Sequence, residues 1–226
     1  MLTVCGAAAV PASAQRHASI LERFLARGEE PPVEYRALRH LEARNAHFGV
    51  HGWIDAWTEF DRAHGFRYEI VAEGGSGYVR RRVLRAALDG EQKMWAAQEP
   101  QRASLAATNY VITDRGQTVE GLAVLGLEPR RKDVLLVDGS IFVEPTDAEL
   151  KRIVGRLSKT PSFWTRNVEI VRRYERLAGV RVPVAFESTA HVLVAGTSTF
   201  AMTYEYEIVN GQRVGQPQRR SHPTRD

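Results

Sequence analysis

The chain has 226 residues, of which 43% are hydrophobic and 26% are charged, enough apolar material for one globular domain with a sizeable core. Its net charge of +4 comes from 31 basic and 27 acidic residues spread along the sequence, which argues against the concentrated basic surface of a nucleic-acid-binding protein. The single cysteine, Cys5, falls within a predicted leader. The mature chain would therefore lack a disulfide, a thiolate zinc site and a cysteine nucleophile.

The N-terminal segment is typical of a signal peptide. Residues 1–10 are small and mostly apolar, and residues 11–14 read Pro-Ala-Ser-Ala, an A-x-A cleavage pattern. We expect residues 1–14 to be removed on export to the periplasm; a flexible Ala-rich terminus is the alternative. No basic residue precedes Arg16, so the natural start is expected upstream of Met1. Because no other stretch has about 18 uninterrupted apolar residues, the sequence predicts no membrane span.

Residues 16–45 are predicted to be helical. Ser19 can cap a first short segment, which Gly28 ends. Two prolines at 31–32 would open a second segment, where proline is tolerated at a helix start. Its apolar residues recur at three-residue spacing: Tyr35, Leu38 and Leu41.

A long β-hairpin is predicted next, with its turn at residues 61–65, because the apolar period changes to two. One parity would form the covered face: Phe48, Val50, Ile54, Ala56 and Phe60, followed after the turn by Phe66, Tyr68 and Ile70. The other face of the first strand would carry His51, Trp53, Asp55 and Trp57.

A helical insertion is predicted over about residues 76–98. The glycine-rich residues 74–77 would break the sheet, Ser76 can cap the helix, and Pro100 would stop it. The apolar residues from Tyr78 onward follow a helical period, with these arginines mostly outward: Arg80, Arg81, Arg82 and Arg85.

The second half of the chain is predicted to be mostly strand. Short segments are expected at residues 110–113, 120–128, 133–137, 140–144 and 149–158, with Asp138-Gly139 as a two-residue hairpin turn. Three long segments follow at residues 163–177, 181–194 and 199–209, separated by turns at Gly179 and Gly196. Residues 212–226 are polar and read as a flexible tail.

These elements predict an α+β fold in which a curved antiparallel sheet forms an unclosed half-barrel capped by helices. A meander of this many strands must close, curl or be covered on its apolar face, and the helices are the available cover. Residues 15–211 would form this single domain.

Chemical motifs are sparse. The glycine loop at residues 74–77 lacks the lysine and hydroxyl of a phosphate-binding loop, so a turn with a helix cap is favoured. His47, His51 and Asp55 share a strand face, but no established ligand motif is present and exposed strand residues are favoured over a metal site. Glu205 and Glu207 fit an exposed strand face rather than an acid–base pair. The sequence thus predicts no catalytic residues, no metal and no cofactor.

The last strands carry the clearest apolar stripe. A concave sheet under a helical lid can leave a cavity, and methionine adapts to irregular apolar guests. An ordinary core is the equal alternative. The residues expected to line such a cavity are Val182, Val184, Phe186, Phe200, Met202, Tyr204, Tyr206 and Ile208.

The region from Tyr35 to Gly211 resembles the lipoprotein-sorting superfamily, which includes LolA, LolB and the sensor domain of RseB. The resemblance rests on the helix, hairpin and helical insertion, and on four blocks: residues 125–130 (LGLEPR), 161–164 (PSFW), 182–184 (VPV) and 204–210 (YEYEIVN). More narrowly, the chain resembles uncharacterised secreted bacterial proteins that carry the same Ser-Phe-Trp block (residues 162–164) and Tyr-Glu-Tyr block (residues 204–206). The resemblance implies a helix-capped, unclosed barrel with an apolar cavity for acyl chains.

The expected function is therefore a non-catalytic periplasmic carrier or sensor that holds a lipid, a lipoprotein acyl chain or another apolar ligand. The first alternative is a structural or interaction protein of the envelope, with a filled core and a protein partner bound on the outer face at Trp53 and Trp57. The second is a hydrolase with an unrecognised site. A cavity holding a paired base and nucleophile would indicate the hydrolase.

Overall fold

A computed structural model describes residues 18–28, 31–97, 100–161, 165–193 and 196–217. The predicted leader at residues 1–14 lies outside these ranges, as does the end of the predicted tail. In the described part of the chain, no helix is both long and apolar enough to cross a membrane.

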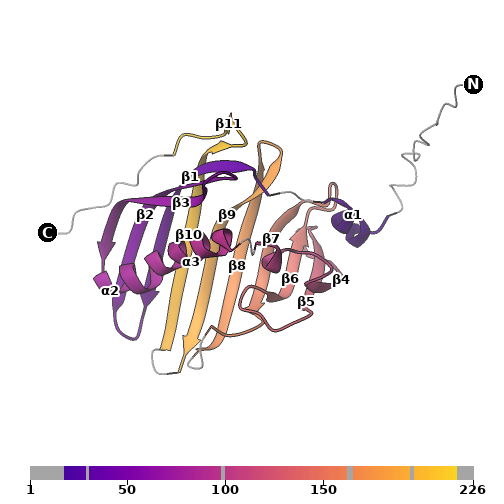
Figure 1. The fold of residues 1–226 in the computed structure, drawn as a ribbon. Helices are drawn as coiled ribbons and strands as arrows, with labels where there is room; N and C mark the ends of the chain where they lie inside the picture. Colours follow the sequence, from indigo (N-terminus) through magenta and orange to yellow (C-terminus); the bar gives the residue numbers. More distant parts are fainter. Residues whose placement is uncertain (1–17, 29–30, 98–99, 162–164, 194–195, 218–226) are drawn as a thin grey trace, which may run out of the picture.

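One curved, unclosed antiparallel sheet of 11 strands forms the body of the protein (Figure 1). The strand order is β3-β2-β1-β10-β9-β8-β7-β6-β5-β4, so among the described strands β3 and β4 are the two edges. A short β11 pairs with β10 outside this order. The strands are β1 (Glu34–Asn45), β2 (Val50–Asp61), β3 (Gly65–Gly75), β4 (Tyr110–Gln117), β5 (Ala123–Pro129), β6 (Val137–Val143), β7 (Leu150–Leu157), β8 (Thr165–Leu177), β9 (Val180–Val192), β10 (Gly196–Val209) and β11 (Gln212–Arg213).

A helical segment crosses one face of this sheet, which we call the inner face (Figure 1). It consists of α2 (Gly77–Val79), the π-helical turn η2 (Arg80–Arg85) and α3 (Ala86–Ala96), and the 3-10 turn η3 (Pro100–Ala103) follows. The Ser76 hydroxyl accepts a hydrogen bond from the Val79 backbone N–H, as expected of a cap. With α1 (Ile20–Ala26), these elements confirm the predicted α+β half-barrel with its helical cover.

The glycines before the helical segment allow a close backbone approach. Gly75 has a φ of 75°, in the left-handed region, and a Cβ there would collide with the His51 carbonyl oxygen. The chain can therefore leave β3 and turn over the inner face directly from the strand end. The glycine loop serves as a turn with a helix cap, as the sequence favoured.

The prediction of helix over residues 16–45 is wrong for its second half, because residues 34–45 form β1. Tyr35, Ala37, Leu41 and Ala43 alternate on the inner face, where all are buried. The fifth inward position is the buried Arg39, whose charge interrupts the two-residue alternation of apolar residues expected of a strand. Leu38 is buried as well, on the opposite face. The buried Leu38 on the otherwise more exposed outer face combines with the inward Tyr35 and Leu41 into a three-residue spacing that mimics a helix.

Asp138-Gly139 is also not the predicted hairpin turn, because both residues lie inside β6. Gly139 pairs with Gly155 of β7, and a Cβ at Gly139 would meet the β7 backbone. The glycine thus serves a close approach between strands. The actual turn comes earlier, where Asp133 accepts hydrogen bonds from the Leu135 and Leu136 backbone N–H groups, so the strand predicted at residues 133–137 begins only at Val137.

The three long C-terminal strands are confirmed as β8, β9 and β10. Gln212 and Arg213 of the predicted tail pair with β10 as β11, and the Val214 backbone N–H donates to Glu207. The ordered sheet therefore continues past Gly211.

Candidate functional site

The inner face carries two separate apolar clusters. The first, here the helix cluster, joins β1, β2, β3 and β10 to the helical segment, which contributes the fully buried Leu84 of η2 and Leu88 of α3. The second, here the strand cluster, joins β4 to β8 with α1, and includes the buried Leu125 and Ile141. The helical segment thus covers the half of the inner face that β1, β2, β3 and β10 form, and the half that β4 to β8 form packs against α1.

A cavity of about 320 Å³ lies on the inner face in the second half. Its wall is built by inward side chains of β4 to β9, and residues from α3 and η3 and the segment that follows cover it. The volume is at the low end of the ~300–1,000 Å³ typical of small-molecule sites, which favours a single chain or ring system. The lining residues are Met94, Ala103, Leu105, Tyr110, Leu127, Val134, Leu135, Val137, Ile153, Leu157, Val168, Ile170, Arg172, Tyr174, Phe186 and Ser188.

Four of these lining residues carry polar side-chain groups. The Tyr110 hydroxyl accepts a hydrogen bond from the Val137 backbone N–H, and burial raises the pKa of Tyr110. Arg172 and Tyr174 both lie on β8, where Tyr174 raises the pKa of Arg172, and Ser188 lies on the neighbouring strand β9. None of the described lining residues is His, Asp, Glu, Lys or Cys, so the cavity offers no paired base and nucleophile.

A buried ion pair ties the helical segment to the sheet. Arg39 of β1, whose side chain is 2% exposed, donates to both carboxylate oxygens of Glu91 on α3, at 2.6 and 3.1 Å. It also donates to the Tyr35 hydroxyl at 2.8 Å, and its guanidinium carbon lies 4.5 Å from the centre of the Tyr204 ring. Burial alone would lower the pKa of Arg39, but Tyr35, Glu91 and Tyr204 outweigh it and raise that pKa. A charge at this depth requires its carboxylate partner.

Two further polar contacts hold α3 in place. The Tyr68 hydroxyl of β3 donates to Asp89 at 2.5 Å, and burial together with that carboxylate raises the pKa of Tyr68 to about 12. The Gln92 side chain donates to the Phe66 carbonyl at 3.3 Å, and Trp95 packs 4.2 Å from Phe60, measured between ring centres. The cover over the helix cluster is therefore fixed by apolar packing and by polar contacts to β1 and β3.

The eight residues predicted to line a cavity do not come together around this one. Only Phe186 lines it. Val182 and Tyr206 are buried in the helix cluster, where the Tyr206 hydroxyl donates to the Pro183 carbonyl at 2.9 Å. The remaining inward residues pack against the same cluster: Val184, Phe200, Met202 and Tyr204.

Ile208 leaves the stripe because of a β-bulge. The pairing of β1 with β10 shifts between Arg36 and Ala37, which leaves Glu207 as the extra residue. Beyond the bulge, Val209 takes the buried inward position with 0% exposure, and Ile208 pairs with Arg36 instead. The predicted parity is therefore correct up to Tyr206 and wrong for Ile208.

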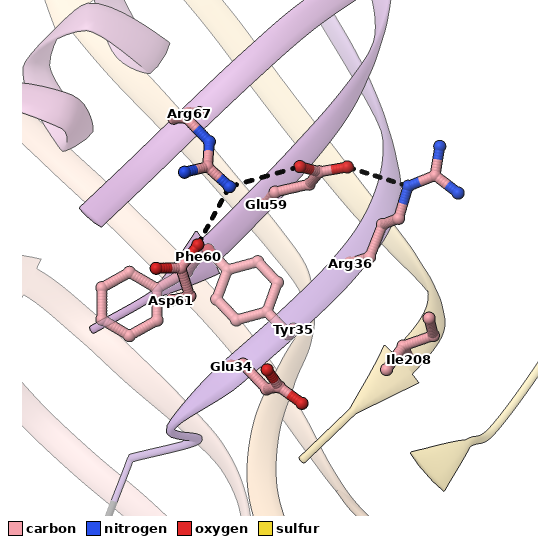
Figure 2. A pocket seen from close by; sticks show the side chains of 8 residues that line it. All are labelled: Glu34, Tyr35, Arg36, Glu59, Phe60, Asp61, Arg67 and Ile208. Carbon is pink, nitrogen blue, oxygen red and sulfur yellow. Dashed lines mark hydrogen bonds and ion pairs between the residues drawn. The ribbon is translucent and has the colours of Figure 1, made fainter. Parts of the chain in front are cut away.

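Ile208 contributes to a hollow of about 200 Å³ at the ends of β1 and β2 (Figure 2). Figure 2 shows Arg67 between two carboxylates, at 3.5 Å from Glu59 and 2.9 Å from Asp61, with Arg36 on the other side of Glu59 at 3.0 Å. The two arginines at this hollow thus pair with Glu59 and Asp61. The network reads as an exposed structural feature of the strand ends.

The predicted alternation of β2 is confirmed on the outer face, where Asp55 lies 2.6 Å from His40 Nδ1. His51 lies 3.8 Å from Glu42 instead, so the structure does not gather His47, His51 and Asp55. In the described ranges no three His, Cys, Asp or Glu side chains are grouped to hold a metal ion.

The cavity residues that the sequence reasoning missed lie mainly on β4 to β8. A signal for them exists in β8, where Val168, Ile170, Arg172 and Tyr174 share one parity. The predicted register of Val168, Ile170 and Tyr174 on one face is confirmed, and it places Arg172 on that face as well.

No family model and no curated protein matches the chain. Solved structures of similar fold include a LolA superfamily protein from Nitrosomonas europaea, with 11% identity over 87% of this chain and 92% of that one, and a TM-score of 0.40. An outer membrane lipoprotein-sorting protein domain from Vibrio parahaemolyticus has 10% identity over 83% and 91%, and a TM-score of 0.39. A DUF1329 family protein from Desulfovibrio piger has 10% identity over 78% and 85%, and a TM-score of 0.38.

Proposed function

We propose that the protein is a non-catalytic binding protein, exported to the periplasm, that holds a lipid, a lipoprotein acyl chain or another apolar ligand. The observation that carries this proposal is the covered cavity of about 320 Å³ between the inner face of β4 to β9 and the α3–η3 side. Its lining is mainly aliphatic and aromatic with a few polar groups, the composition of a ligand site. The absence of acid–base and nucleophile pairs among the described lining residues supports binding without catalysis.

The structural-protein alternative is supported by the other half of the sheet, where the helix cluster is packed beneath α3. If that alternative holds for the whole molecule, the cavity stays empty and an apolar guest finds no saturable site. The experiment below separates the two directly.

The test uses N-phenyl-1-naphthylamine, a neutral apolar probe whose fluorescence rises on leaving water. We expect saturable binding with one site per chain, and native mass spectrometry after gentle purification should show co-purified lipid. Absence of saturable binding to the folded protein would overturn the proposal.

Matched variants locate the site. Leu157 lines the cavity, and its neighbour Arg156 is exposed on the opposite face of β7. We expect Leu157→Trp to fill the space and weaken probe binding about tenfold or more, whereas Arg156→Trp adds the same bulk outside and leaves affinity unchanged. Circular dichroism checks the fold, and Ser188→Leu fills the cavity from β9 if Leu157→Trp does not fold. Equal binding by both tryptophan variants would place the probe elsewhere and contradict the proposed site.

A further inference from the structure

One charged side chain, Arg172, stands out among the described residues that line the cavity. It lies near the middle of β8, with its guanidinium carbon 5.2 Å from the centre of the Phe186 ring on β9. Its side chain is only partly exposed. A cation in such a setting is costly unless a negative or strongly accepting group compensates it.

The described residues do not supply such a carboxylate within ion-pair distance of Arg172. The neighbouring Tyr174 raises the pKa of the Arg172 guanidinium. Glu91 attracts Arg172 from further away, but both of its oxygens are bound by Arg39. Arg172 thus brings a positive charge to the cavity wall without an ion-paired carboxylate among the described residues.

The polar and apolar parts of the lining are segregated along β8. Val168 and Ile170 come first on the inward face and are buried in the strand cluster, and Arg172 and Tyr174 follow at the next inward positions. Ser188 of β9 lies opposite Ile170 of β8, beside the boundary between the apolar and polar parts of the lining. A guest with an apolar body and one polar end matches that order.

We propose that the cavity binds an amphiphile with a negatively charged headgroup, a carboxylate or a phosphate, held by Arg172 with Tyr174 and Ser188 beside it. This rests on the proposed binding function and names its ligand class. The tail would lie against the aliphatic wall, and the headgroup would accept charge-assisted hydrogen bonds from the guanidinium. Tyr174 and Ser188 can donate to the remaining headgroup oxygens.

The test displaces N-phenyl-1-naphthylamine with three ligands of equal chain length: dodecanoate, dodecyl phosphate and dodecanol. We expect at least one of the anions to compete about tenfold or more better than the alcohol, the size of one or two charge-assisted hydrogen bonds. The stronger anion identifies the headgroup as carboxylate or phosphate. Equal competition by all three would overturn the anionic headgroup and leave apolar binding intact, whereas failure of the neutral probe itself would overturn the function.

Variants at adjacent positions then test the residue. Arg172→Met should abolish the preference for anions and keep affinity for the neutral probe, and Arg172→Lys should retain part of the preference because it keeps the charge. Arg173→Met is the matched control, since Arg173 is exposed and pairs with Glu187. A preference that survives Arg172→Met, or is lost equally in Arg173→Met, would overturn the assignment. If Arg172→Met does not fold, the competition of the three ligands on the wild-type protein still tests the preference for an anionic headgroup.

Discussion

Replacing Glu91 by glutamine tests whether the buried ion pair fixes the helical segment on the sheet. The variant keeps the shape of the side chain and leaves the Arg39 guanidinium, 2% exposed, without its carboxylate. Two charges about 4 Å apart attract by roughly 4 kcal/mol at an effective dielectric constant of about 20, and breaking a buried pair from one side costs about 3–5 kcal/mol. Because Glu91 is 24% exposed, water moderates this value. We expect the free energy of unfolding to fall by about 3 kcal/mol.

The assay is urea-induced unfolding, followed by tryptophan fluorescence and by circular dichroism. Glu187→Gln is the matched control: its pair with Arg173 has a similar distance, 2.5 Å, but the two side chains are 48% and 51% exposed. Exposed pairs contribute less than about 1 kcal/mol, so the control should be nearly silent. Replacing both Arg39 and Glu91 by methionine should recover most of the loss, since apolar packing substitutes for a buried pair. A loss below about 1 kcal/mol for Glu91→Gln, equal to the control, would refute the reasoning.

Three further predictions concern the sheet and its turns. Gly139→Val places a side chain against the β7 backbone and should lower the free energy of unfolding in urea by about 1–3 kcal/mol. Gly90→Ala is the control, since a Cβ at this position of α3 meets open space and should not destabilise the protein. Equal losses in the two variants would contradict the role of Gly139 in the close approach of the strands. Tyr206→Phe removes a partly buried hydrogen bond to β9 and should cost about 1 kcal/mol, and an unchanged urea midpoint would show that this bond contributes nothing. The His64 backbone N–H, with further contacts from the His64 and Arg67 side chains, lowers the pKa of Asp61 from 3.8 to about 2. The stability that ionised Asp61 contributes is therefore present above pH 4 and lost toward pH 2. The melting temperatures of the wild type and Asp61→Asn should converge as the pH falls through that range. A difference that stays constant with pH would contradict this prediction.

The β2–β3 hairpin and the C-terminal strands could be predicted because one face of each is covered and the other is more polar. In β2, Ile54, Ala56 and Phe60 are buried on one face, as the alternation indicated. The same logic failed for β1, where a buried Leu38 interrupts the polar outer face and a buried Arg39 interrupts the apolar inward residues. Partners on β10 and α3, distant in sequence, make a charge acceptable there.

The cavity could not be placed from the sequence for a related reason. The stripe from Phe200 to Tyr206 is apolar enough for a site, yet in the structure it packs against the helix cluster. Periodicity identifies the inward face of a strand, but whether that face meets a helix or a void depends on where the cover comes to lie. Only the path of α3 and η3 decided that β4 to β9 border the open space.

By itself, the sequence determined the β2–β3 hairpin, the antiparallel run of consecutive strands in the second half, the helix capped by Ser76 and the inward parity of most strands, since these depend on local periodicity and turn chemistry. The tertiary structure decided three things: the strand identity of residues 34–45, the switch from Ile208 to Val209 at the Glu207 bulge, and the exposure of Arg172 to a cavity. Each depends on pairing or covering between segments far apart in the chain. A pattern that reports the neighbours of one residue along its own strand carries no information on those contacts.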